Sequence, residues 1–160
     1  MSRPPCRTLR LVVNGQERQA EVRDNTLLLD LLREGFGLWG AREGCGVGAC
    51  GSCTVLVDGH PISSCLKLAA TLPDGCVITT VEGLAAGEKL DLVQEAFLEA
   101  GAFQCAFCTP GMLLAVKALL AANPRPTEEE ARAYLNGNYC RCGAHPEILQ
   151  AVRALAERGA

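Results

Sequence analysis

Residues 43–65 read EGCGVGACGSCTVLVDGHPISSC, and this stretch decides how the first half of the chain folds. Cys45, Cys50 and Cys53 are separated by four and two residues, and Cys65 follows after eleven more. The glycines of this stretch let the backbone come close to a group held by the thiols, with its N–H groups directed inward. They are Gly44, Gly46, Gly48 and Gly51.

This cysteine spacing is that of a plant-type [2Fe-2S] site. Zinc is the alternative, since Cys50-x-x-Cys53 alone would serve zinc equally well. The additional cysteine upstream and the density of glycine favour the iron-sulfur cluster. The run Gly46 to Gly51 also matches the dinucleotide-binding pattern G-x-G-x-x-G. It neither follows a strand nor opens a βαβ unit, so we do not expect it to bind a nucleotide.

A second set of cysteines lies in the other half of the chain. Cys105-x-x-Cys108 and Cys140-x-Cys142 are separated by a stretch that contains helix patterns and prolines. Four thiolates on two loops at helix ends suit either zinc or iron, so their spacing leaves both metals open. The first site favours iron here, because a redox centre needs a second one nearby to act as a relay.

The chain changes from strand patterns to helix patterns near residues 82–88. We expect a hairpin from Leu9 to Val22 with a turn at Asn14-Gly15, because apolar residues alternate on both sides of that turn. Strands are predicted at 54–57 and 77–81, with a turn at Asp58-Gly59 and no regular element from Gly35 to Gly51. Helices are predicted at 27–33, 92–100, about 110–120, 127–135 and from about 146 onward. We therefore expect two domains, 1–81 and 82–160.

The composition limits the classes of function. The 160 residues carry a net charge of −3 without a basic block, which argues against nucleic acid as a partner. Neither a signal-peptide pattern nor an apolar run of membrane-spanning length is found, so we expect a cytoplasmic protein without a membrane span. The ten cysteines then indicate metal binding rather than disulfides.

Four motifs resemble the small iron-sulfur subunit of the xanthine dehydrogenase family of molybdenum hydroxylases. That family includes aldehyde oxidoreductases, aerobic carbon monoxide dehydrogenases and several heteroaromatic hydroxylases. The likeness extends from about Thr8 to Val152. The motifs are Glu43 to Gly59, Ser64-Cys65-Leu66, Gln104 to Met112 and Gly137 to Cys142.

The resemblance implies an α+β protein with an N-terminal β-grasp, ferredoxin-like domain followed by a C-terminal four-helix [2Fe-2S]-binding domain. The first domain would hold one cluster and the second domain the other. The implied ligands are Cys45, Cys50, Cys53 and Cys65 for the first cluster, and Cys105, Cys108, Cys140 and Cys142 for the second.

The resemblance also implies the partners. The second cluster would lie nearest the molybdopterin cofactor of a large subunit, with Gln104 and Cys142 approaching the pterin. The first cluster would face the next acceptor, usually FAD in a medium-sized subunit. The complex would be a hetero-oligomer, for which a dimer of heterotrimers is one arrangement.

Two positions depart from the family pattern. Ala106 stands where glycine is frequent, and Gly143-Ala144-His145-Pro146 replaces a frequent Thr-Gly-Tyr. Neither departure alters a ligand. Cys6 and Cys76 fall outside both sets, and we expect them to be ordinary thiols. His60 and His145 are interpreted as turn or helix-start residues, because both sets of four cysteines are complete without them.

The function predicted is electron transfer. A molybdenum site withdraws two electrons from a substrate, and two one-electron centres in series carry them away singly. The chain has no Ser-His-Asp set, carboxylate pair or phosphate loop for turnover on its own. Two alternatives remain open: a binding module stabilised by zinc, and a free-standing diffusible ferredoxin.

Overall fold

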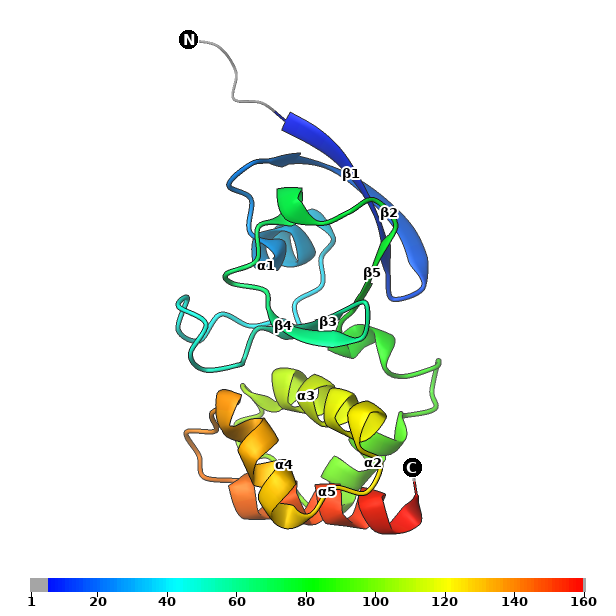
Figure 1. The fold of residues 1–160 in the computed structure, drawn as a ribbon, viewed down its shortest axis with the longest axis vertical. Helices are drawn as coiled ribbons and strands as arrows, with labels where there is room; N and C mark the ends of the chain where they lie inside the picture. Colours follow the sequence, from blue (N-terminus) through cyan, green and yellow to red (C-terminus); the bar gives the residue numbers. More distant parts are fainter. Residues whose placement is uncertain (1–5, 160) are drawn as a thin grey trace.

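The computed structural model describes residues 6–159, which form a β-rich part above a helical part in Figure 1. The β-rich part is a mixed sheet in the order β2-β1-β5-β3-β4, in which β1 and β5 are parallel and the other neighbours antiparallel. Its strands are β1 (Cys6–Val13), β2 (Gln16–Arg23), β3 (Thr54–Val57), β4 (His60–Ser63) and β5 (Cys76–Thr79). Together with the helices below the sheet, this confirms the α+β class.

Both predicted hairpin turns are present. Asn14 and Gly15 have φ angles of 51° and 76°, and Asp58 and Gly59 have 48° and 81°. Positive φ at both central residues is the type I′ geometry that matches the twist of the flanking strands. These two turns therefore fix the registers of β1 with β2 and of β3 with β4.

The strand predictions needed two corrections. Strand β4 is absent from the sequence prediction. It lies on the edge of the sheet, where the missing N–H of Pro61 is tolerated. The strand predicted over 77–81 is wrong at its end. Thr80 leaves the sheet and exchanges hydrogen bonds with Asn14, and a short 3-10 turn begins at Val81.

The predicted helix after residue 27 begins at Leu28. Its first turn, α1 (Leu28–Asp30), continues as a π-helical segment over Leu31–Gly35. Leu28 and Leu32 are fully buried under the sheet, in a core with Leu9, Val55 and Ile78. No helix or strand interrupts residues 36–53, as predicted for the glycine-rich loop.

The helical part contains α2 (Leu92–Glu99), α3 (Thr109–Ala122), α4 (Glu128–Tyr134) and α5 (His145–Arg158). Helix α3 is apolar on nearly every face because it lies between β3 and the other helices (Figure 1). Leu56 of β3 belongs to the same hydrophobic core as α3. The sheet and the helices are therefore packed directly against each other.

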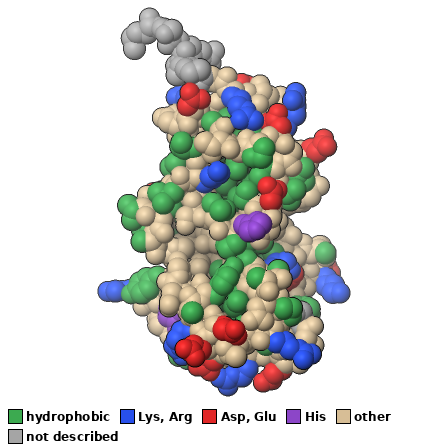
Figure 2. Space-filling model, in the orientation of Figure 1, with side chains coloured by type: hydrophobic (Ala, Val, Ile, Leu, Met, Phe, Trp, Pro, Cys, Tyr) green, Lys and Arg blue, Asp and Glu red, His purple; other side chains and the backbone are tan. Residues whose placement is uncertain are grey.

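The surface carries no segregated charge on the face seen in Figure 2, where Lys and Arg are interspersed with Asp and Glu. None of the helices described is long and apolar enough to cross a membrane.

Candidate functional site

The first set of cysteines converges on the loop between residue 36 and β3. Cys45 and Cys50 lie on the loop, Cys53 lies immediately before β3, and Cys65 follows β4. The Cys50 thiol is hydrogen-bonded to Cys45, and the Cys65 thiol to Cys53. Cys65 also interacts electrostatically with Cys45. The structure thus brings all four predicted residues together, as two thiol pairs.

Backbone N–H groups are directed at the first set. Val47 N and Ala49 N donate to Cys45 Sγ at 3.5 and 3.3 Å. These two bonds, with others from Cys50, lower the pKa of Cys45 from 9.0 to about 7. Burial and the bond to Cys53 raise the pKa of Cys65 to about 11. The loop therefore favours a thiolate at Cys45, the form in which cysteine binds a metal.

The glycines of the loop are required by its shape. Gly46, Gly48 and Gly51 have φ angles of 66°, 72° and 70°, a region that L residues rarely adopt. At Gly44 the limit is space, because a Cβ would lie 2.9 Å from Cys50 Sγ. At Gly51 a Cβ would lie 2.4 Å from Gly137 O of the helical part. The predicted closeness of backbone to sulfur is thus present in the geometry.

The second set converges in the helical part, where Cys105 and Cys108 precede α3 and Cys140 and Cys142 precede α5. The thiols again form pairs, but across the two loops: Cys105 with Cys142, and Cys108 with Cys140. Electrostatic interactions join Cys105 to Cys108 and to Cys140. All four residues predicted for the second site are therefore together.

The second set also has backbone donors. The Phe107 N–H and the Cys142 thiol lower the pKa of Cys105 by hydrogen bonds. Burial raises the pKa of Cys140, but N–H groups that include Ala144 outweigh it and leave the pKa lowered. Burial raises the pKa of Cys108 to about 12. Each thiol pair thus contains one sulfur that favours the thiolate.

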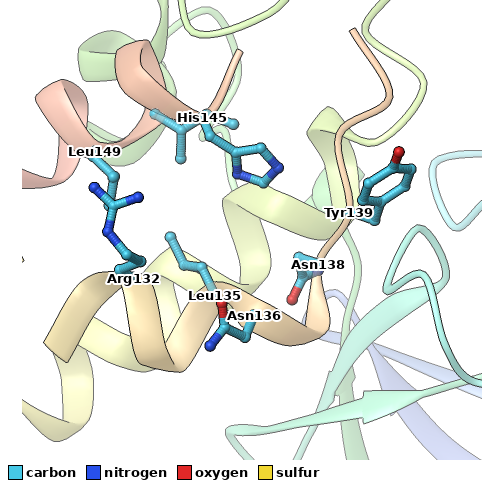
Figure 3. A pocket seen from close by; sticks show the side chains of 8 residues that line it. Arg132, Leu135, Asn136, Asn138, Tyr139, His145 and Leu149 are labelled. Carbon is cyan, nitrogen blue, oxygen red and sulfur yellow. The ribbon is translucent and has the colours of Figure 1, made fainter. Parts of the chain in front are cut away.

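His145 contacts the loop that carries Cys140 and Cys142. Its Nε2 accepts a hydrogen bond of 3.3 Å from Cys140 N. The ring faces a pocket of about 350 Å³ between α4 and α5, with Arg132 on the opposite side and Asn136 below (Figure 3). The interpretation of His145 as a helix-start residue is correct, since α5 begins there. Its contact with the loop of Cys140 was not predicted.

The two sets are joined by hydrogen bonds that the sequence did not indicate. Tyr139 N donates to Cys50 O at 2.9 Å, and Asn138 Nδ2 donates to Gly51 O at 3.0 Å. Arg42 Nη1 donates to Ala106 O at 2.6 Å. Spacing along the chain gives no sign of such contacts, because the partners are 64 to 89 residues apart.

Gln104 and Cys142 also lie together, since Gln104 Nε2 donates to Cys142 O at 3.2 Å. Gln104 is exposed. Cys76, the first residue of β5, is buried, and its thiol lies 3.4 Å from Asp58 Oδ2. Cys6 is exposed at the start of β1. Neither Cys6 nor Cys76 is part of either thiol set.

No group of three or more His, Cys, Asp or Glu side chains within residues 6–159 is arranged to hold a single metal ion. The donors instead fit a two-iron group, in which each iron takes two thiolates, because the thiols meet in pairs and each set has two pairs.

Comparison with known proteins identifies both parts of the chain. Residues 11–83 match the 2Fe-2S iron-sulfur cluster binding domain, and residues 80–153 match a [2Fe-2S] binding domain family. The chain is 48% identical to the nicotinate dehydrogenase small FeS subunit of Eubacterium barkeri, covering 94% of this chain and 96% of the relative. It is 47% identical to the xanthine dehydrogenase iron-sulfur-binding subunit of Escherichia coli O157:H7, covering 91% of each.

A solved structure agrees with these relatives. A chain of quinoline 2-oxidoreductase from Pseudomonas putida 86 superposes with a TM-score of 0.90 at 44% identity, and 96% of each chain is covered. The chain belongs to the xanthine dehydrogenase family of molybdenum hydroxylases, as the small iron-sulfur subunit that transfers electrons in an oxidoreductase complex.

Proposed function

We propose that the two thiol sets hold one [2Fe-2S] cluster each and that each thiol pair binds one iron. Cys45 with Cys50, and Cys53 with Cys65, would bind the irons of the first cluster. Cys105 with Cys142, and Cys108 with Cys140, would bind those of the second. The observation that carries this proposal is the pairing of thiols in both sets.

A bound [2Fe-2S] cluster accepts and releases one electron at a time. The chain's own residues hold the sulfurs, donate hydrogen bonds to them and limit the access of water. Cys53, Cys65 and Cys140 are buried, and Val47 N and Ala49 N donate to Cys45 Sγ. Gly44, Gly46, Gly48 and Gly51 would allow the backbone to enclose the first cluster. The bond between Tyr139 N and Cys50 O keeps the two loops in contact.

We propose that the chain receives electrons from a large subunit that binds molybdopterin. Gln104 and Cys142 would contact the pterin, and their mutual hydrogen bond would hold the Gln104 amide in place. The relatives are named as subunits of larger enzymes, which supports the presence of partner subunits for this chain. The exposed apolar side chains Phe107 and Tyr139, next to the second thiol set, would be covered by the large subunit.

The first set would face the next acceptor, FAD in a medium-sized subunit. Val47 and Leu66, which flank this set, are 69% and 58% exposed. Apolar side chains so placed suit burial against another protein. We further propose a hetero-oligomer such as a dimer of heterotrimers, a location in the cytoplasm where thiols stay reduced, and domains of 1–81 and 82–160.

The experiment is metal, sulfide and spectroscopic analysis of the purified full-length chain. We expect about four iron atoms and about four acid-labile sulfides per chain, and two paramagnetic species on reduction. Cys140→Ser should abolish one species and about half of the iron. The matched control is Cys76→Ser, which removes a buried thiol outside both sets and should leave both species in place. A colourless chain that contains zinc would refute the proposal.

The alternative of a diffusible ferredoxin is tested separately. The chain should co-purify from its source with a much larger polypeptide that contains molybdenum, through an interface above about 2,000 Å². A monomer that retains both clusters but binds no larger chain would favour the ferredoxin.

A further inference from the structure

Arg42 connects the two cysteine loops. It lies three residues before Cys45, and its Nη1 donates a hydrogen bond of 2.6 Å to Ala106 O, which lies between Cys105 and Cys108. Its guanidinium carbon also lies 5.6 Å from the centre of the Phe107 ring. One side chain from the first loop therefore contacts two consecutive residues of the second.

Ala106 is held in an unfavourable backbone conformation. Its φ angle is 57°, in the left-handed region where a Cβ is crowded. Residues 6–159 contain two other non-glycine residues with positive φ, Asn14 and Asp58, and both have polar side chains that accept backbone hydrogen bonds. Alanine has no such group, so the conformation of Ala106 must be stabilised from outside.

The conformation of Ala106 sets the direction of the peptide group between Ala106 and Phe107. Its carbonyl oxygen accepts the hydrogen bond from Arg42, and its N–H donates to the Cys105 sulfur. The two bonds extend in opposite directions from the same peptide group. Rotation about the N–Cα bond of Ala106 to a negative φ would relieve the strain at this residue, but it would also turn that peptide group and break both bonds.

We propose that Arg42 is a positioning residue that fixes the Ala106–Phe107 peptide so that its N–H stays directed at Cys105, and thereby tunes the second cluster. The inference rests on the proposed function, because it needs a cluster at the second set. Hydrogen bonds to a cluster's sulfurs stabilise its more negative, reduced state. Loss of Arg42 should therefore lower the reduction potential of the second cluster.

The test is a redox titration of the full-length, iron-loaded chain, followed by electron paramagnetic resonance. The species that Cys140→Ser abolishes identifies the second cluster. Arg42→Met should shift that species to a lower potential and leave the other unchanged, and Arg42→Lys, which keeps the charge and a donor, should recover most of the shift. Arg18→Met is the matched control, because Arg18 lies at the same 5.6 Å from an aromatic ring, that of Phe36, which is nine residues before Cys45.

Testing Arg42→Met in a chain that also carries Ala106→Gly distinguishes a positioning role of Arg42 from a direct effect of its charge on the cluster. Glycine adopts the left-handed conformation without help, so Arg42→Met should shift the potential much less there than in the natural sequence. An equal shift in both backgrounds, or no shift in either, would overturn the inference. If Arg42→Met alone loses the second cluster, Arg42→Met with Ala106→Gly should retain it, and failure to do so also counts against the role.

Iron release to a chelator gives a readout independent of potential. Arg42→Met should accelerate release from the second cluster about fivefold, the factor that corresponds to the lower end of the cost of the left-handed conformation for an L residue such as Ala106. Unchanged release would contradict the inference. A chain that contains no iron at all would instead refute the proposed function, so the two failures are distinguishable.

Discussion

Single residues decide which thiols of this chain are available for iron. Eight of the ten cysteines lie in two sets, in which backbone N–H groups lower the pKa of Cys45, Cys105 and Cys140. Cys76 has the opposite environment. It is 3% exposed, and burial followed by the neighbouring Asp58 carboxylate raises its pKa from 9.0 to about 11, while Lys67 acts in the other direction.

This shift predicts a specific dependence of stability on pH. The folded chain keeps the Cys76 proton longer than the unfolded chain, so the contribution is complete below pH 9.0 and is lost as the pH rises through about 11. Cys76→Ser should remove this loss, which we expect to be roughly 1–2 kcal/mol. Urea unfolding across that pH window checks it, and parallel pH profiles for the two proteins would contradict the assignment.

At the scale of elements, α3 is placed by the contact of its first turn with the cysteine loop. Gly111 lies in that turn, and a Cβ there would lie 2.3 Å from Gly51 O and 3.3 Å from the Ser52 carbonyl carbon. The backbone of α3 thus rests on the backbone of the loop. No flexible side chain is present at this contact to give way.

Gly111→Ala should therefore destabilise the chain, although alanine favours helix by about 1 kcal/mol over glycine. We expect a net loss of about 1–3 kcal/mol, because α3 must shift away from the loop. Gly137→Ala is the control, since a Cβ at Gly137 has no heavy atom within 4 Å. Chemical denaturation of both variants measures the difference, and equal stabilities would show that α3 can move at little cost.

Helix α4 depends on its capping box, in which Thr127 Oγ1 accepts from Glu130 N and the Glu130 carboxylate accepts from Thr127 N. Thr127→Ala should cost about 1 kcal/mol, because the N–H of Glu130 loses its acceptor. Thr127→Ser keeps the oxygen and should be nearly neutral. Thermal unfolding followed by circular dichroism distinguishes them, and a serine variant as unstable as the alanine variant would argue against the cap.

At the scale of the whole molecule, the two parts are joined at the cysteine loops. Asn138 is 8% exposed and donates to Gly51 O and to Thr54 Oγ1, at 3.0 and 3.3 Å. It thus ties the segment before Cys140 to the segment between Cys50 and β3. The relative position of the two candidate clusters depends on this buried contact.

Asn138→Ala should weaken the coupling of the two parts. We expect the free energy of unfolding to fall by about 1–3 kcal/mol. We also expect the helices to melt at a different temperature from that at which the first cluster loses its colour. Asn136→Ala, two residues away and exposed, is the matched control. Calorimetry and visible absorbance during heating provide the measurement, and a single transition shared by both variants would contradict a coupling role.

Features that arise from neighbouring residues can be predicted from the order of the amino acids. The turns at Asn14-Gly15 and Asp58-Gly59, the Thr127 cap and the apolar periodicity of the helices all depend on groups within a few residues of each other. The grouping of cysteines into two sets followed from their spacing and the family resemblance. Their pairing within each set was not determined, because spacing does not reveal that Cys105 meets Cys142 rather than the nearer Cys108.

The way in which the two halves meet depends on contacts between residues far apart in the chain. Arg42 and Ala106 are 64 residues apart, and Asn138 and Gly51 are 87 apart. Strand β4 with its Pro61 and the end of β5 at Thr79 likewise depend on their places in the sheet. Local sequence restricts the backbone angles of adjacent residues, whereas a hydrogen bond between distant loops exists only after the sheet and α3 have packed together. The contact between the two cysteine loops is therefore a property of the packed molecule.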